Sequence, residues 1–207
     1  MGDKNSFSDI NENFDHEFMD PVDWLDIHIN ALFTELCQIR AAVHIFKVAD
    51  REWDRRVQAK DVPKYWEVRT TLYESLVYRT FLGLSKIFSN TREQSLLKAT
   101  NQIEQLQLNN EMIPRAIKNI REKLATSQMV KIVHTYRDKF FAHLDKENVL
   151  SYCRIDPTAV MTYIDIEEID EWLCLVGNFY EVCFGKKLSY ERPELSCDDI
   201  IHTFFWQ

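Results

Sequence analysis

Apolar residues recur every three to four positions along most of this chain, which is the spacing of one face of an α-helix. The alternation of apolar and polar residues that is typical of strands is scarce. The 207 residues include only 4 glycines and 5 prolines, the two residue types that most often interrupt helices. We therefore expect an all-α protein.

Two long helices are expected in the first half of the chain, at about residues 22–55 and 63–89. We expect the first to bend or break near Asp50. Pro63 suits the first turn of the second helix, whose wide apolar face predicts a central position in the fold. The stripe of the first helix consists of Trp24, Ile27, Ala31, Leu32, Leu36, Ile39, Val43 and Phe46. The apolar face of the second consists of Trp66, Tyr73, Leu76, Val77, Phe81, Leu84, Ile87 and Phe88.

Two shorter helices are expected next. Thr91 is the expected cap of the first, which ends near Leu108. The second follows Pro114 and ends near Thr126. Its inward-facing residues are Ile117, Ile120 and Leu124.

A last long helix is expected near the end of the chain. The Asp165-x-x-Glu168 pattern predicts its start, and Gly185 its end. Its apolar stripe consists of Ile169, Trp172, Leu173, Val176, Phe179, Tyr180 and Cys183.

Three parts make up the expected domain organisation: an acidic flexible N-terminal arm at 1–20, a helical domain at 21–185 and a C-terminal tail at 186–207. The tail is too apolar to lie free in water, so we expect it to dock on the body of the protein or on a partner. Its apolar residues are Ile200, Ile201, Phe204, Phe205 and Trp206.

The overall charge and the cysteines exclude several classes of protein. A net charge of −8 argues against a protein that coats nucleic acid through bulk charge. The 5 cysteines include no Cys-x-x-Cys pair, so neither a disulfide framework nor a zinc site is expected. Cys37 and Cys174 lie in apolar helical sequence, where we expect buried thiols. His28 and His44 stand alone on the first helix, as is typical of structural histidines with satisfied hydrogen bonds.

The sequence carries no sign of export or of membrane insertion. The N-terminus is polar and acidic, unlike a signal peptide. No apolar run approaches the roughly 20 residues that a membrane-spanning helix needs. We therefore expect a cytoplasmic protein that does not span a membrane.

The most unusual stretch runs from Ser127 to Lys146 and is expected to form one helix with Ser127 as its N-cap. Its apolar stripe consists of Val130, Val133, Phe140, Phe141 and Leu144. Arg137 falls within about 40° of the centre of that stripe, where an unpaired guanidinium costs several kcal/mol. His143 lies at the edge of the stripe, roughly 90° from its centre. The helix thus carries an Arg within its apolar face and a His beside it.

This pattern, Arg137-Asp138-Lys139-Phe140-Phe141-Ala142-His143, resembles the motif of the HEPN family, in which an Arg, often followed by a polar residue, precedes a His. Two stretches resemble the abortive-infection (Abi U-type) branch of that family: Ala142-His143-Leu144-Asp145 and Leu82-Gly83-Leu84-Ser85-Lys86-Ile87-Phe88. The resemblance covers the chain from about Trp24 to Gly185. It implies a HEPN-like up-and-down bundle of about five to six helices with additional short helices.

The resemblance also implies a function: a metal-independent endoribonuclease that acts as a toxin or phage-defence effector. HEPN ribonucleases work as homodimers in which the Arg and His of both chains line one cleft. Arg137 would then hold the phosphate, His143 would transfer protons, and Asp138 would orient one of them. RNA would be cut to 2′,3′-cyclic phosphate and 5′-hydroxyl ends without a cofactor, and an antitoxin or regulatory protein is a further expected partner. The sequence itself has no spacing typical of metal ligands, so no metal site is expected.

Further residues near the motif are candidates for supporting roles. The central helix carries basic residues that we expect to bind RNA, with a solvated helix face as the alternative for the lysines. These residues are Lys131, His134, Lys139 and Lys146. The second helix carries a polar seam whose members are candidates to orient Arg137, with a plain polar border between packed helices as the alternative. The seam consists of Glu74, Tyr78 and Ser85.

Other interpretations of the motif stay open. Arg137 pairs with a buried carboxylate such as Glu74 in one of them, and His143 only favours the dipole at a helix C-terminus in another. Both together give a catalytically inactive HEPN domain that binds a nucleotide or a partner protein. A third interpretation is a helical interaction domain in which Arg137 forms a core ion pair. Asp145 occupies the position at which nucleotidyltransferase-paired HEPN toxins have a Tyr, which argues against AMPylation control there.

Overall fold

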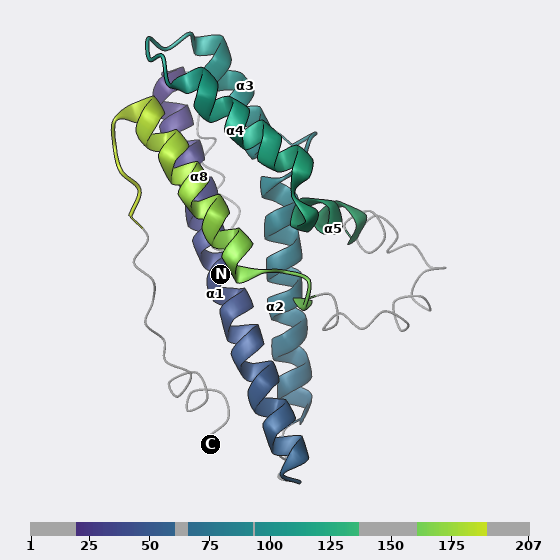
Figure 1. Cartoon of the computed structure of the whole chain (residues 1–207). Coiled ribbons are helices and arrows are strands. Elements are labelled where there is room, and N and C mark those ends of the chain that lie inside the picture. The colour runs from purple at the N-terminus through teal and green to yellow at the C-terminus, as the bar shows by residue number, and fades with distance from the viewer. Residues whose placement is uncertain (1–19, 61–65, 93, 137–160, 190–207) are drawn as a thin grey trace, which may run out of the picture.

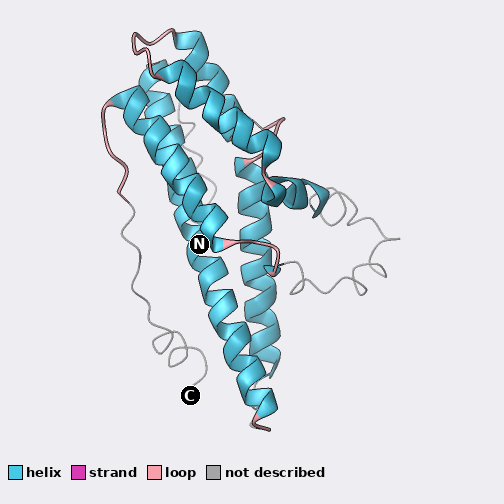
Figure 2. Ribbon diagram, in the orientation of Figure 1, coloured by secondary structure: helices cyan, strands magenta, loops and turns pink. Residues whose placement is uncertain are grey.

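The computed structural model describes residues 20–60, 66–92, 94–136 and 161–189, and of residues 66–69 the backbone only. The described residues form helices joined by turns and loops, without a strand, which confirms the all-α prediction (Figure 2). The helices are α1 (Pro21–Gln58), α2 (Trp66–Ile87), α3 (Leu96–Leu106), α4 (Ile113–Thr126), α5 (Gln128–Tyr136) and α8 (Ile166–Phe184).

The long helices run up and down beside one another. In Figure 1, α1 descends from the top of the molecule, and α2 and α8 return upward on either side of it. The shorter α3 and α4 pack on each other at the upper end, where α3 contacts α1 and α4 contacts α8. Helix α5 packs on α2 and projects to the side. This arrangement agrees with the expected HEPN-like bundle.

Helix α1 is longer than expected. Asp20 caps it by accepting a hydrogen bond from the Val22 amide at 2.7 Å. The helix continues through Asp50 to Gln58, so the expected break near Asp50 is wrong. The reason is that its buried face continues past that point. Val48 and Ala49 are buried just before Asp50, and Glu52 is buried just after it.

The expected apolar stripe of α1 is correct only in part. Most of its members are buried in the core, but Ile27 is 59% exposed and Ala31 is also exposed. Helices α8, α2 and α3 cover α1 from other sides and leave this flank open. The apolar face of α1 is therefore shifted relative to the stripe that spacing alone indicated.

Helices α1 and α2 approach closely at Gly83. A Cβ atom at this position would lie 2.7 Å from Ile39 Cδ1 and 2.7 Å from Glu35 Oε1, so a larger residue does not fit without movement. Beside it, the Arg79 guanidinium donates to both carboxylate oxygens of Glu35, at 2.7 and 2.8 Å. These contacts fix the position of α2 against α1.

Helix α3 begins later than expected. Ser95, not Thr91, is its cap, and the Ser95 hydroxyl accepts a hydrogen bond from the Lys98 amide at 3.3 Å. Upstream, the buried Ser89 hydroxyl accepts from the amides of Thr91 and Arg92, at 3.2 and 3.1 Å. Because these amides are bonded in a turn, the chain does not start a helix at Thr91.

Helix α8 starts and ends as the sequence predicts. Asp165 accepts a hydrogen bond from the Glu167 amide at 3.1 Å, and Gly185 ends the helix with a φ of 66°, a conformation that suits glycine. Trp172 and Phe179 are fully buried, and the Trp172 ring lies 4.8 Å from that of Phe88. Helix α8 therefore contributes two of the largest fully buried side chains of the core.

The two predicted buried thiols differ in the structure. Cys37 is half-buried, and burial raises its pKa to about 11. Cys174 is exposed, so the prediction is wrong for this residue.

Candidate functional site

The expected catalytic residues follow directly on α5. Arg137, Asp138 and His143 lie outside the described residues, as do Lys139 and Lys146. The structure describes the helix that leads to them, up to Tyr136, and the elements that hold this helix. The described part of the site therefore consists of α5 and the residues that hold α5 in place.

Ser127 fixes the start of α5, as the sequence predicts. Its backbone ends α4, and its hydroxyl accepts a hydrogen bond from the Val130 amide at 3.0 Å. The same hydroxyl donates to the Glu168 carboxylate on α8. Glu168 thus does not close a capping box on its own helix but ties α8 to the first turn of α5.

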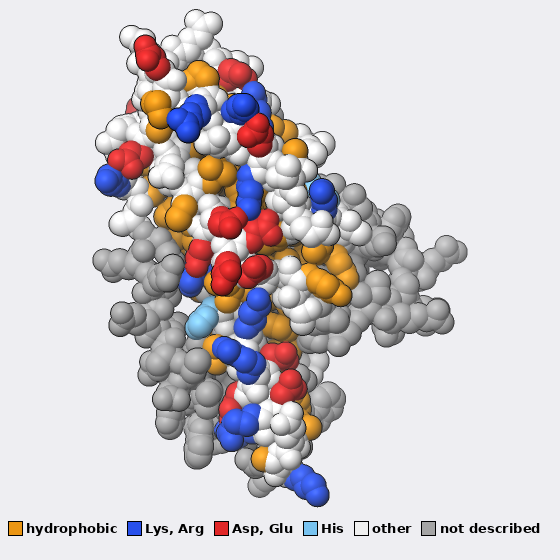
Figure 3. Space-filling model, viewed as in Figure 1, with side chains coloured by type: hydrophobic (Ala, Val, Ile, Leu, Met, Phe, Trp, Pro, Cys, Tyr) orange, Lys and Arg blue, Asp and Glu red, His pale blue; other side chains and the backbone are white. Residues whose placement is uncertain are grey.

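A cluster of charges surrounds this junction. Lys123, in the last turn of α4, pairs with Glu171 and lies 3.8 Å from Glu168. Nearby, Arg40 of α1 pairs with Asp170, with one of the two contacts at 3.1 Å. Figure 3 shows acidic side chains gathered over the first turns of α8, next to basic ones. The acidic residues also suit the positive end of the α8 dipole.

The far end of α5 rests on α2. Met129, Val130 and Val133 are buried, and the Tyr136 ring lies 5.6 Å from that of Phe81 on α2. Burial, together with nearby Tyr163, raises the pKa of Tyr136. Arg137 is the next residue after Tyr136, so the chain enters the motif from a position set by α2 and by the segment before α8.

Two of the expected RNA-binding residues lie on the described part of α5. Lys131 is exposed and His134 is half-buried, and their spacing of three residues makes them neighbours on the helix surface. The buried side of α5 is formed by apolar residues instead. The part of α5 that the structure describes thus presents basic groups outward.

The expected polar seam on α2 does not form one buried group. Glu74 is exposed, Tyr78 is half-buried and Ser85 is buried. The Ser85 hydroxyl donates to the Leu82 carbonyl of its own helix at 2.9 Å, so its hydrogen-bonding need is met locally. Because Glu74 is exposed, it does not provide the buried carboxylate that this alternative pairing of Arg137 requires. Whether Tyr78 orients Arg137 stays a prediction.

Three contributors to this support were not singled out from the sequence. Phe81 was expected only as a core residue, Glu168 only as part of a cap, and Tyr163 not at all. All three contact α5 from distant parts of the chain. Helical spacing carries no signal for such contacts, because it describes neighbours on one helix only.

The comparison with known families decides the identity. The family model of the HEPN AbiU2 proteins matches residues 23–195, which is well over half of the chain. The chain belongs to the HEPN AbiU2 family. Comparison with curated proteins and with solved structures gave no match.

Membership of the HEPN AbiU2 family confirms the resemblance seen in the sequence. It supports a role in phage defence through abortive infection. The matched range includes α5 and the motif from Arg137 to His143.

Two structural searches bear on other expectations for this AbiU2 protein. Within the described ranges, no helix is both long and apolar enough to cross a membrane. In the same ranges, no group of three or more His, Cys, Asp or Glu side chains is arranged to hold a metal ion. The division into arm, domain and tail stays a prediction, since most of the arm and tail lies outside the described residues.

Proposed function

We propose that this AbiU2 protein is a metal-independent endoribonuclease that acts as a toxin or effector in phage defence. The observation that best supports this proposal is that α5, the helix leading to Arg137, is held in place at both ends. Helix α5 is tied to α8 at Ser127 and rests on α2 at Tyr136, immediately before Arg137. Catalytic groups need such fixed supports, because small displacements reduce rates strongly.

The chemistry follows from the properties of the two motif residues. RNA cleavage without a metal requires that the 2′-hydroxyl lose a proton, that the phosphorane be stabilised and that the 5′-oxygen gain a proton. His143 serves as the proton-transfer group near neutral pH, an effect worth roughly 10²–10⁴-fold. Arg137 binds the phosphate through two parallel hydrogen bonds and offsets its developing charge, while Asp138 orients one of the two.

The outward side of α5 supports RNA as the substrate. The protein as a whole carries a net charge of −8, so binding relies on local basic groups rather than on bulk charge. Lys131 is exposed and His134 is half-buried on α5, and Lys139 and Lys146 follow in the sequence. These four residues are the proposed contacts to the RNA backbone.

The active form in this proposal is a homodimer. On a straight helix Arg137 and His143 are about 120° apart, so they do not share a face. Two copies related by a two-fold axis bring the Arg137 of one chain opposite the His143 of the other. An antitoxin or regulatory protein is the further proposed partner.

The test is cleavage of bulk RNA by the purified protein in EDTA. We expect cleavage to continue, with 2′,3′-cyclic phosphate and 5′-hydroxyl ends. His143→Ala and Arg137→Lys should each abolish it, the latter because lysine keeps the charge but loses the planar fork. Lys118→Gln, an exposed change on α4, is the matched control. Cleavage that needs added Mg²⁺, or full activity in either motif variant, would contradict the proposal and favour the inactive HEPN alternative.

A further inference from the structure

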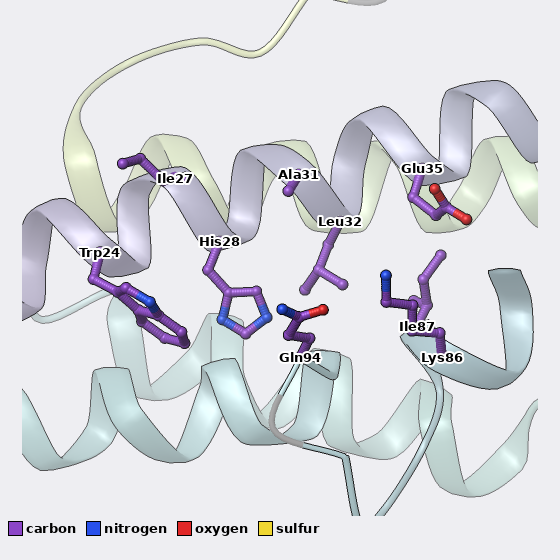
Figure 4. A pocket seen from close by; sticks show the side chains of 9 residues that line it. All are labelled: Trp24, Ile27, His28, Ala31, Leu32, Glu35, Lys86, Ile87 and Gln94. Atoms are coloured by element: carbon purple, nitrogen blue, oxygen red, sulfur yellow. The ribbon is translucent and has the colours of Figure 1, made fainter. Parts of the chain in front are cut away.

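A pocket lies between the first half of α1 and the chain that leads from the end of α2 to α3, away from α5. Its volume is about 280 Å³, and none of its lining residues belongs to α5. Figure 4 shows Trp24, His28 and Leu32 of α1 facing Lys86, Ile87 and Gln94 across it. Its described lining residues include none of the residues proposed for RNA cleavage.

His28 forms part of the pocket wall. Its side chain is 6% exposed, yet neither ring nitrogen has a hydrogen-bond partner that meets normal geometry among the described residues. Burial lowers the pKa of His28, and the facing backbone of Gln94 opposes this only in part. The ring is therefore neutral near pH 7. Both nitrogens are shielded from the pocket, so His28 contributes ring surface to the wall and not a hydrogen bond to a ligand. Sequence spacing had indicated a histidine with satisfied hydrogen bonds.

Lys86, an exposed side chain at the pocket, is the indication of a ligand. Its ammonium group points into the pocket between Leu32 and Glu35 (Figure 4), and it forms no ion pair with a described residue. Glu35 does not neutralise it, because Arg79 already holds both oxygens of that carboxylate. The pocket thus presents one positive charge without a counter-ion, which favours an anionic ligand.

The size and the walls of the pocket define the rest of the ligand. A cavity of about 150 Å³ holds one benzene molecule, so a pocket nearly twice that size holds a ring system with a substituent. Trp24, Leu32 and Ile87 provide apolar walls, and the Trp24 ring lies 4.7 Å from that of His28. An aromatic ring suits these surfaces.

We propose that this pocket binds a small aromatic carboxylate. The carboxylate pairs with Lys86, and the ring packs against Leu32 and Ile87. Such a site is additional to the proposed ribonuclease function and does not depend on it.

The test is calorimetric titration of the full chain with indole-3-carboxylate and with its neutral match, indole-3-carboxamide. We expect one site for the acid and about tenfold weaker binding of the amide, since a charge-assisted hydrogen bond is lost. Lys86→Gln should weaken acid binding about tenfold and leave amide binding unchanged. Lys118→Gln, whose lysine lies on α4 outside the pocket, should bind both like the wild type.

A second variant tests the location. Ala31 lines the pocket but is exposed, so Ala31→Phe fills the space without disturbing the core and should abolish binding of both compounds. Circular dichroism establishes that each variant is folded. Equal affinity for acid and amide, an unaffected Lys86→Gln variant, binding that survives Ala31→Phe, or no binding at all would overturn the proposal. RNA cleavage plays no part in these readouts, so the two proposals fail or succeed separately.

Discussion

At the scale of single residues, two glycines on different helices meet opposite surroundings. A Cβ at Gly83 would lie 2.7 Å from the buried Ile39 side chain, whereas a Cβ at Gly177 would lie 3.6 Å from Phe33, an ordinary contact. Both are helical, so alanine would favour the helix by about 1 kcal/mol at either position. Whether each alanine substitution raises or lowers the free energy of unfolding therefore depends on the packing around the glycine.

We predict that Gly83→Ala destabilises the protein and that Gly177→Ala stabilises it slightly. Overpacking costs about 1–3 kcal/mol, which exceeds the gain in helix propensity at residue 83. Gly177→Ala should retain most of that gain. Urea denaturation of both variants measures the difference. A Gly83→Ala variant as stable as the wild type or more stable would show that α1 and α2 are not as closely packed as described, and a destabilised Gly177→Ala variant would contradict the second prediction.

Glu52 is the residue with the clearest predicted pH dependence. Hydrogen bonds from Arg55, aided by Arg56 and opposed by burial, lower the pKa of this carboxyl to about 2 from 4.5. Since the folded state has the lower pKa, the stabilisation is fully present above pH 4.5 and is lost as the pH falls toward 2. We predict that Glu52→Gln is less stable than the wild type at pH 7 and that the difference shrinks across this window.

Denaturation of both proteins at several pH values between 7 and 2 checks this prediction. The difference between them isolates Glu52 from the other carboxyls, which titrate in both. A gap that stays constant down to pH 2 would show that Glu52 is not held by the two arginines in solution.

At the scale of elements, the junction of α4, α5 and α8 determines where α5 starts. Ser127 satisfies an amide of α5 and donates to Glu168 on α8. Loss of an N-cap costs about 1 kcal/mol, and the Glu168 carboxylate would lose a donor as well. The junction is thus both a stabilising contact and the anchor of the proposed catalytic helix.

We predict that Ser127→Ala lowers the free energy of unfolding by about 1–2 kcal/mol and speeds hydrogen exchange of the α5 amides. Ser75→Ala is the matched control, because Ser75 is exposed and, among the described residues, its hydroxyl bonds only to the Thr71 carbonyl of α2. The control should change stability by less than about 0.5 kcal/mol. Equal effects of the two substitutions would remove Ser127 as the anchor of α5.

At the scale of the whole molecule, the proposed ribonuclease site needs two copies of the chain. We predict a two-fold homodimer in solution, with catalysis shared between Arg137 of one chain and His143 of the other. A mixed dimer of one Arg137→Ala chain and one His143→Ala chain retains one intact Arg–His pair, so it should regain part of the activity that both homodimeric variants lose.

Differently tagged chains, co-expressed and purified through both tags, provide this mixed dimer. Light scattering measures the assembly of the wild type and of each variant. A strictly monomeric protein that cleaves RNA, or a mixed dimer as inactive as its parents, would exclude a site shared across chains.

The sequence by itself determined the helices and the family. Helical spacing of apolar residues, few glycines and prolines, and the caps at Ser127, Asp165 and Gly185 are local features, and local features specify local structure. The same holds for the motif from Arg137 to His143, which indicated the family before any contact was known.

Only the tertiary structure decided which faces are covered and which polar groups meet. The periodicity of a helix shows which side chains share a face but not what packs against it, so Ile27, Ala31 and Cys174 proved exposed. The bond between Ser127 and Glu168 joins residues 41 positions apart, and the pocket around His28 is closed by Lys86 and Gln94 from another part of the chain. Such contacts arise from packing between elements, for which a single sequence has no periodic signal.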